Sequence, residues 1–213
     1  MPNDMFSVLR LVPAVVLLAA CGESAPTVEE VRAATEKYAS VDAALADGYV
    51  RDPMDVCETS YYLGSLRDEG TVGIHFFRPD LLGVTLGEGE SDRRTRHDAT
   101  GTHTDFLRPA MLVYEPQPDS VLELVAVGNM VSARAWEESG HREPPSFGDQ
   151  PYDFHSGESG TGFPAHYDLH MWLFRENPSG MFAPYNPAVT CENHNFNLPV
   201  IVPPDGIPRA PHH

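Results

Sequence analysis

Histidine is the residue type in this sequence with the clearest capacity for chemistry. The chain carries 10 histidines, and the segment His166-Tyr167-Asp168-Leu169-His170 sets two of them on either side of a carboxylate at alternate positions. Imidazole nitrogens and carboxylate oxygens are common protein ligands of zinc, iron and copper. The spacing therefore makes this segment a candidate site for a divalent transition metal.

Strand geometry limits which of these side chains can share one ion. On a strand, His166, Asp168 and His170 point to one face. Residues four apart lie about 13 Å from each other, too far for two ligands with bonds of about 2 Å. Residues two apart can share an ion, so Asp168 pairs with either His166 or His170. A metalloprotease-type helix is excluded, because Tyr167 stands where that motif requires Glu.

A third ligand has to come from another strand, and His75 is the best candidate. It lies inside the apolar run of residues 71–77, where a lone polar group needs a partner. Together, His75, Asp168 and His170 would make a set of two histidines and one carboxylate. Such a set suits zinc or iron and leaves positions open for water or substrate. The alternative is that His75 and His170 are structural histidines, hydrogen-bonded to backbone or to Asp168, with no metal.

These side chains need a sheet to bring them together. Runs rich in β-branched and aromatic residues, separated by Gly, Pro and Asp, predict four strands. The runs are residues 71–77, 110–115, 121–131 and 167–174. Residues 115–120 are typical of a hairpin connection, and the lack of helical patterns between the runs favours antiparallel pairing.

A helical pattern precedes the sheet. Apolar residues recur at helical spacing through residues 26–48, with Thr27 and Glu30 as a capping box. The predicted fold class is α+β, an N-terminal amphipathic helix packed on a mainly antiparallel sheet with long loops. The loops are the polar stretches 87–105 and 137–165, and loops of such length are either functional or disordered.

The N-terminal residues predict export and a lipid anchor. Residues 11–20 form a short apolar stretch after Arg10, which is the layout of a signal peptide. Ten residues are too few to span a bilayer, which needs about 20. Leu18-Ala19-Ala20-Cys21 resembles the bacterial lipobox, in which the Cys becomes the lipid-carrying N-terminus. The alternative is an ordinary secretory signal with an incidental Cys. We therefore expect an extracytoplasmic protein held on a bacterial membrane by acyl chains, palmitate among them, on Cys21.

With Cys21 assigned to lipid, Cys57 and Cys191 remain. They are predicted to form a disulfide, because an exported protein meets an oxidising compartment. Free thiols or a Cys-ligated metal are the alternative, but close Cys pairs typical of structural zinc sites are absent from the sequence.

Composition excludes some function classes and bounds the domain. A net charge of −17 argues against nucleic acid binding and against a surface that clings to anionic lipid by itself. We predict a signal peptide at 1–20, a short tether at 21–26, one α+β domain at 27–198 and a proline-rich tail at 199–213. Patterns for a nucleophilic serine elbow, a phosphate-binding loop or a Cys-x-x-Cys redox pair are absent from the sequence.

Four motifs resemble an uncharacterised family of exported bacterial proteins. They are Gly73-Ile74-His75, Leu112-Val113-Tyr114-Glu115-Pro116, Leu169-His170-Met171-Trp172-Leu173, and a segment from Asn177 through Asn186-Pro187 to Cys191. The resemblance covers most of the chain and supplies no activity. It implies that His75, His170 and Glu115 occupy motif positions, whereas His166 departs from the pattern.

Two functions from different classes fit these patterns. One is a divalent metal-binding domain that uses His75 and His170 with Asp168 or Glu115, suited to a hydrolase or an oxygen-handling enzyme. The other is a non-catalytic envelope protein whose histidines are structural and whose loops bind a protein partner or a small ligand.

Overall fold

The computed structural model describes residues 25–60, 68–86, 96, 99–157 and 162–194. Its main feature is a seven-stranded sheet with the order β1-β3-β4-β5-β9-β8, in which β2 also pairs with β3. Every strand pairing in it is antiparallel. The strands are β1 (Val50–Arg51), β2 (Cys57–Thr59), β3 (Thr71–Phe77), β4 (Met111–Pro116), β5 (Leu122–Ser132), β8 (Asp153–His155) and β9 (His166–Met171). The α+β class predicted from the sequence is confirmed.

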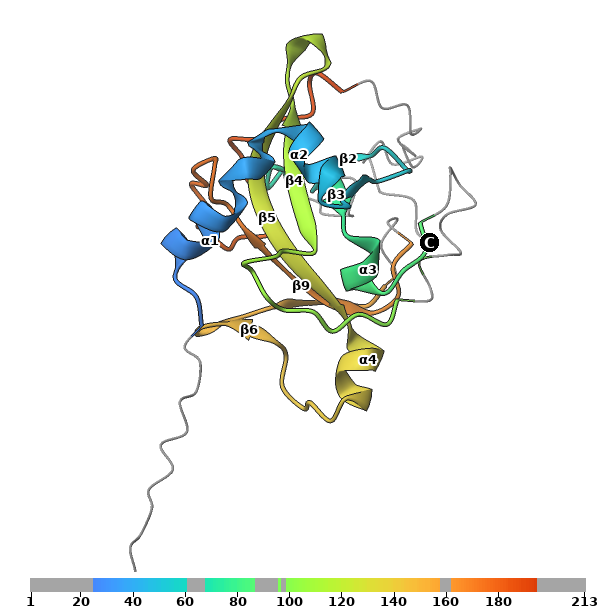
Figure 1. Cartoon of the computed structure of the whole chain (residues 1–213). Coiled ribbons are helices and arrows are strands. Elements are labelled where there is room, and N and C mark those ends of the chain that lie inside the picture. Colours follow the sequence, from blue (N-terminus) through green and yellow to red (C-terminus); the bar gives the residue numbers. More distant parts are fainter. Residues whose placement is uncertain (1–24, 61–67, 87–95, 97–98, 158–161, 195–213) are drawn as a thin grey trace, which may run out of the picture.

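The predicted N-terminal helix packs on the sheet but is broken into three pieces, α1 (Val28–Thr35), η1 (Glu36–Ala39) and α2 (Val41–Ala46). All three lie against one face of the sheet (Figure 1). The capping box of Thr27 and Glu30 is present at the start of α1. The helix breaks because Ser40 adopts an extended backbone and uses its side chain to cap α2, accepting from the Ala43 amide.

The central strands agree closely with the sequence pattern. β3 has the predicted bounds, and β4 and β5 start one residue later than expected. Their hairpin is closed by the Gln117 amide donating to the Val121 carbonyl at 2.8 Å. β9 ends at Met171 rather than at residue 174, because the Leu173 amide donates to the Met171 carbonyl in a tight turn, and the amide of Phe174 donates to Val125 of β5 in its place.

The long loop predicted at 137–165 was wrong in part. After α4 (Ala133–Glu138), this stretch contains the two-stranded ribbon of β6 (Ser146–Phe147) and β7 (Gln150–Pro151), and then β8. Each of these strands is only two or three residues long, so tertiary pairing rather than local pattern decides them. α3 (Pro79–Leu82) and η3 (Pro118–Ser120) are short connections.

Alternate residues divide the sheet into two faces of different character. The face under the helices is apolar, and Ile74, Phe76, Leu112, Leu169 and Met171 are all buried there. The opposite face carries His75 and Phe77 from β3, Met111 from β4, and Asp168 and His170 from β9, which line one cavity. The alternation predicted for β9 is confirmed.

The predicted disulfide between Cys57 and Cys191 is present, with Cα atoms 5.8 Å apart. It ties β2 to the C-terminal segment. The next residue on β2 is Glu58, which pairs with Gly73 of β3 and lines the same cavity. The bridge therefore holds one wall of the cavity in place.

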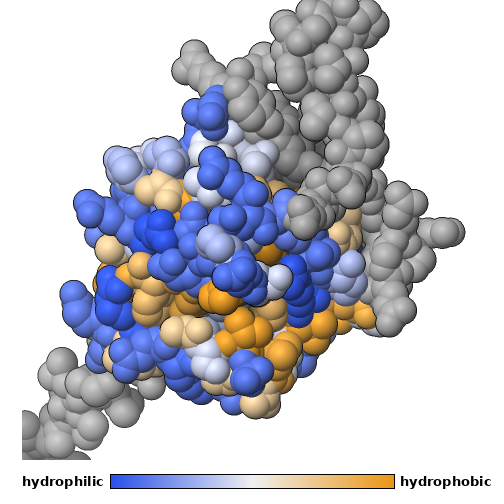
Figure 2. All heavy atoms as spheres, turned by 90° about the horizontal axis from the view of Figure 1, so that it is seen from above, coloured by the Kyte–Doolittle hydropathy of each residue, from blue (hydrophilic) through white to orange (hydrophobic). Residues whose placement is uncertain are grey.

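Hydrophilic side chains cover much of the face drawn in Figure 2, with apolar residues gathered in smaller patches between them. Among the described residues there is no helix with the length and apolar character needed to cross a membrane. Cys21, the signal peptide and the tail at 199–213 lie outside the described residues, as does most of the loop 87–105. The lipid anchor therefore stays a prediction.

Candidate metal centre

Three side chains from two neighbouring strands converge on one point. His155 of β8 and His166 of β9 are directly paired across the sheet, and Asp168 lies two residues along β9 on the same face. One ligand atom from each of the three lies within 4.8 Å of the others. We call His155, His166 and Asp168 the outer group, because the His155 side chain is 37% exposed.

Asp168 uses its two oxygens to reach both histidines. Its Oδ1 is 3.2 Å from His155 Nε2, and its Oδ2 is 3.8 Å from His166 Nε2. Two ligands with bonds of about 2.0 to 2.1 Å to a tetrahedral ion are about 3.3 Å apart. The Asp168–His155 separation therefore matches that of two ligands on one ion, and the Asp168–His166 separation is about 0.5 Å longer.

Backbone contacts fix the ring of His166. Its Nδ1 is 2.7 Å from the Pro164 carbonyl, which can only accept, so Nδ1 carries the proton and donates. The lone pair is then on Nε2, facing Asp168. Burial lowers the pKa of His166, so the ring is neutral at pH 7. In metalloproteins, a histidine ligand is usually oriented by such a hydrogen bond from the ring nitrogen that does not bind the metal.

The contact with His155 controls the charge of Asp168. Burial by itself would raise the pKa of Asp168, but the hydrogen bond from His155 and the charge of that imidazole hold it well below its usual range. The same hydrogen bond raises the pKa of His155. Asp168 is thus ionised at neutral pH, and its negative charge favours the binding of a cation.

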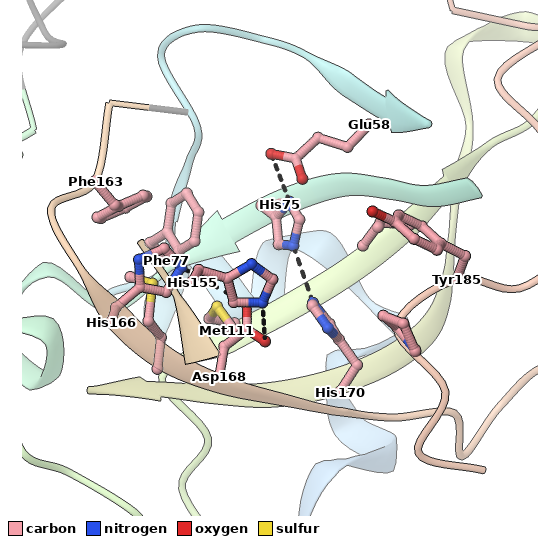
Figure 3. Close-up of a pocket in the computed structure, with 13 residues that line it drawn as sticks. Glu58, His75, Phe77, Met111, His155, Phe163, His166, Asp168, His170 and Tyr185 are labelled. Atoms are coloured by element: carbon pink, nitrogen blue, oxygen red, sulfur yellow. Dashed lines mark hydrogen bonds and ion pairs between the residues drawn. The ribbon is translucent and has the colours of Figure 1, made fainter. Parts of the chain in front are cut away.

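A second group lies deeper on the same face. His75 and His170 face each other with their Nε2 atoms 3.3 Å apart, and Glu58 Oε1 is 3.6 Å from His75 Nδ1 (Figure 3). Their side chains are less than 10% exposed. We call His75 and His170 the inner pair, with Glu58 behind it.

Burial makes the inner groups neutral. It lowers the pKa of His170, and burial together with the neighbouring His170 lowers the pKa of His75 to about 3. Burial and the nearby Asp52 carboxylate raise the pKa of Glu58 to about 8. Two neutral imidazoles therefore face each other at a point from which water is largely excluded.

Both groups line a single cavity of about 100 Å³. Its remaining wall is mostly apolar and consists of Val72, Phe77, Met111, Met130, Phe163, Pro184 and Tyr185. Figure 3 shows Phe77 and Phe163 near the outer group and Tyr185 near the inner pair. Space for only a few waters or a small group, an apolar lining and a few converging polar atoms are typical of a small-molecule or ion site.

The structure brings together four of the five ligands predicted from the sequence. His75, His166, Asp168 and His170 all line the cavity. The pairing differs from the main hypothesis, because Asp168 joins His166 rather than His170, and His75 faces His170.

Glu115 does not belong to the site. Its carboxylate is 2.8 Å from Arg175 Nη2 and accepts from the Thr190 amide at 2.8 Å. These contacts hold the C-terminal segment on the hairpin next to Cys191. The prediction of Glu115 as a ligand was wrong, because a motif position does not show whether a carboxylate is structural or binds metal.

His155 is the candidate ligand that sequence reasoning missed. It lies in the stretch that the Gly and Pro content marked as a loop. A signal was nevertheless present, because aromatic and polar residues alternate in Tyr152-Asp153-Phe154-His155, as expected of a half-buried strand.

Comparison of this chain with protein-family models, with curated proteins and with solved structures finds no significant match. The resemblance to exported bacterial proteins therefore stays a prediction, and the function has to be inferred from the site itself.

Proposed function

We propose that this chain is an exported, lipid-anchored domain that binds one divalent transition metal ion through His155, His166 and Asp168. The observation that supports it best is the convergence of three ligand atoms within 4.8 Å, from two strands held in fixed register. The orientation of His166 by the Pro164 carbonyl adds to this, since it turns the free nitrogen toward Asp168.

The donor set narrows the choice of metal. Two imidazoles and one carboxylate suit zinc or iron(II), and copper is also compatible with imidazole. Three protein ligands leave at least one coordination position for water, as in catalytic rather than structural zinc sites. When bound, zinc would supply an activated water at neutral pH, which makes metal-assisted hydrolysis of a small polar group the activity we favour.

The structure favours this function over a purely structural role of the histidines. A structural group needs only hydrogen-bond satisfaction, which Asp168 and His155 already provide for each other. That role does not explain why His166 presents its lone pair to the same carboxylate in a cavity partly open to solvent.

Metal analysis of the full chain, purified without a histidine tag and dialysed against metal-free buffer, tests the proposal. We expect stoichiometric zinc or iron in the wild type and the loss of one equivalent in His155→Ala/His166→Ala. His141→Ala is the matched control, because His141 is exposed and stacks on Trp136 away from the cavity. Metal content that is equal in the double variant and the wild type would contradict the outer site.

Anchoring has a separate test. We expect Cys21→Ser to move the protein from the membrane fraction to the soluble extracytoplasmic fraction without changing its metal content. Unchanged membrane retention would contradict lipid attachment at Cys21 and would leave the metal site untouched.

A further inference from the structure

We propose that the inner pair is a second metal position, in which His75 and His170 both bind through Nε2. The position goes beyond the outer site and uses none of its residues. Its ligand is a divalent transition metal that accepts imidazole nitrogen, such as zinc or cobalt.

The separation of the two nitrogens supports a shared ion. The 3.3 Å between His75 Nε2 and His170 Nε2 equals the spacing of about 3.3 Å between two imidazole ligands on a tetrahedral ion. The side chains already stand at ligand distance from each other.

Glu58 supplies the support expected behind a metal-binding histidine. His75 Nδ1 is buried and has no hydrogen-bond partner among the described residues, and the nearest carboxylate oxygen, from Glu58, lies 3.6 Å away. Histidine ligands usually donate their other N–H to a carboxylate or a carbonyl. A metal at Nε2 would place the ring proton of His75 on Nδ1, the nitrogen nearest to Glu58.

The part of the sheet between the two histidines has no side chain at one position, Gly128. His75 is on β3 and His170 is on β9, with β4 and β5 between them. Gly128 of β5 is the register partner of both Met111 and His170. A Cβ atom at Gly128 would lie 2.9 Å from Met111 Cε and 3.6 Å from His170 Cδ2. Gly128 therefore avoids a clash with the Leu169 carbonyl and with Met111, which lines the same cavity as the two histidines.

The two metal positions would be neighbours in one cavity. Asp168 of the outer group and His170 of the inner pair are two residues apart on β9, so their Cα atoms are about 6.6 Å apart and their side chains share a face. Glu58 and Asp168 supply carboxylates within the cavity. The only described arginine buried beside it, Arg96, bonds to Asp52 and lies over the Phe163 ring.

The test is a titration of the metal-free full chain with Co²⁺ and then Zn²⁺, with stoichiometry read from mass spectrometry and from cobalt absorption. We expect two equivalents in the wild type and one in His75→Gln/His170→Gln, held by the outer group. His155→Ala/His166→Ala is expected to keep one equivalent at the inner pair. Glu58→Gln keeps all ligands and is expected to weaken the inner position by about 10- to 100-fold.

The outcomes separate this inference from the proposed function. One equivalent in the wild type, retained in His75→Gln/His170→Gln, would overturn the inner site and make the pair a structural contact. One equivalent lost in both double variants would also overturn it, in favour of a single shared ion. Loss only in His75→Gln/His170→Gln would support the inner site while contradicting the outer one. Circular dichroism and retained cobalt at the outer group check that the inner variant is folded.

Discussion

The two faces of the sheet are both buried, but one buries apolar side chains and the other buries ionisable ones. Under the helices, Ile74, Phe76 and Leu112 are apolar and at most 2% exposed. On the other face, the alternate residues of β3 and β9 include His75, Asp168 and His170. The backbone is shared, so the contrast lies only in the side chains and in what covers them.

The difference separates stability from function. Burying apolar surface stabilises the fold, whereas burying imidazole and carboxylate groups costs free energy unless each finds a partner. The cavity face bears this cost at six imidazole and carboxylate groups, those of Glu58, His75, His155, His166, Asp168 and His170. Such local conflict with good packing is expected at a functional site.

The largest effect on the free energy of unfolding is expected from removal of the disulfide beside the cavity. Cys57 and Cys191 are 134 residues apart in sequence, so Cys57→Ser/Cys191→Ser is expected to lower the free energy of unfolding by about 5 kcal/mol through the entropy of the open chain. Urea denaturation measures it. Cys21→Ser is the control that keeps the bridge, and a loss below about 1 kcal/mol would show that packing alone holds the cavity wall.

Next in size is a cavity made on the apolar face. Phe76→Ala removes a buried ring that packs against Tyr114 at 4.8 Å between centroids, with an expected loss of about 3 to 5 kcal/mol. Metal content per folded molecule should stay at the wild-type value, because the ring points away from the histidines. A fall in metal content per folded molecule would contradict the separation of stability and metal binding between the two faces.

The smallest of the three effects is the loss of stability at acidic pH that is caused by His75. In the metal-free protein, His75 holds its proton less tightly in the fold, with a pKa of about 3, than in the unfolded chain, where it is 6.5. The unfolded state therefore binds more protons between these values, and stability is lost as pH falls from 6.5 toward 3.

Between pH 6.5 and 4.5, the wild type should lose on the order of 2 kcal/mol more than His75→Gln. Glu58 acts in the opposite direction, because its raised pKa of about 8 favours the fold at low pH, but it is present in both proteins and cancels. Chemical denaturation at the two pH values measures the difference. Equal pH dependence in the two proteins would mean that His75 is protonated in the fold.

Sequence reasoning found the parts of the site that lie in strongly patterned strands. β3 and β9 have a clear alternation of side chains, so His75, His166, Asp168 and His170 could be predicted from residue pattern alone to share one face. It missed His155, because β8 has three residues and is a strand only through its pairing with β9. It misplaced Glu115, whose partner Arg175 is distant in sequence.

By itself, the sequence determined the α+β class, the central strands with their faces, and the candidate disulfide, because periodicity and residue type are local properties of the chain. Only the tertiary structure decided which histidines meet. Pairing of β8 with β9 brings His155 to His166, and the register of β3, β4, β5 and β9 brings His75 to face His170 across two strands. Ligand geometry depends on distances of a few tenths of an ångström between distant segments, and strand register and packing set these distances.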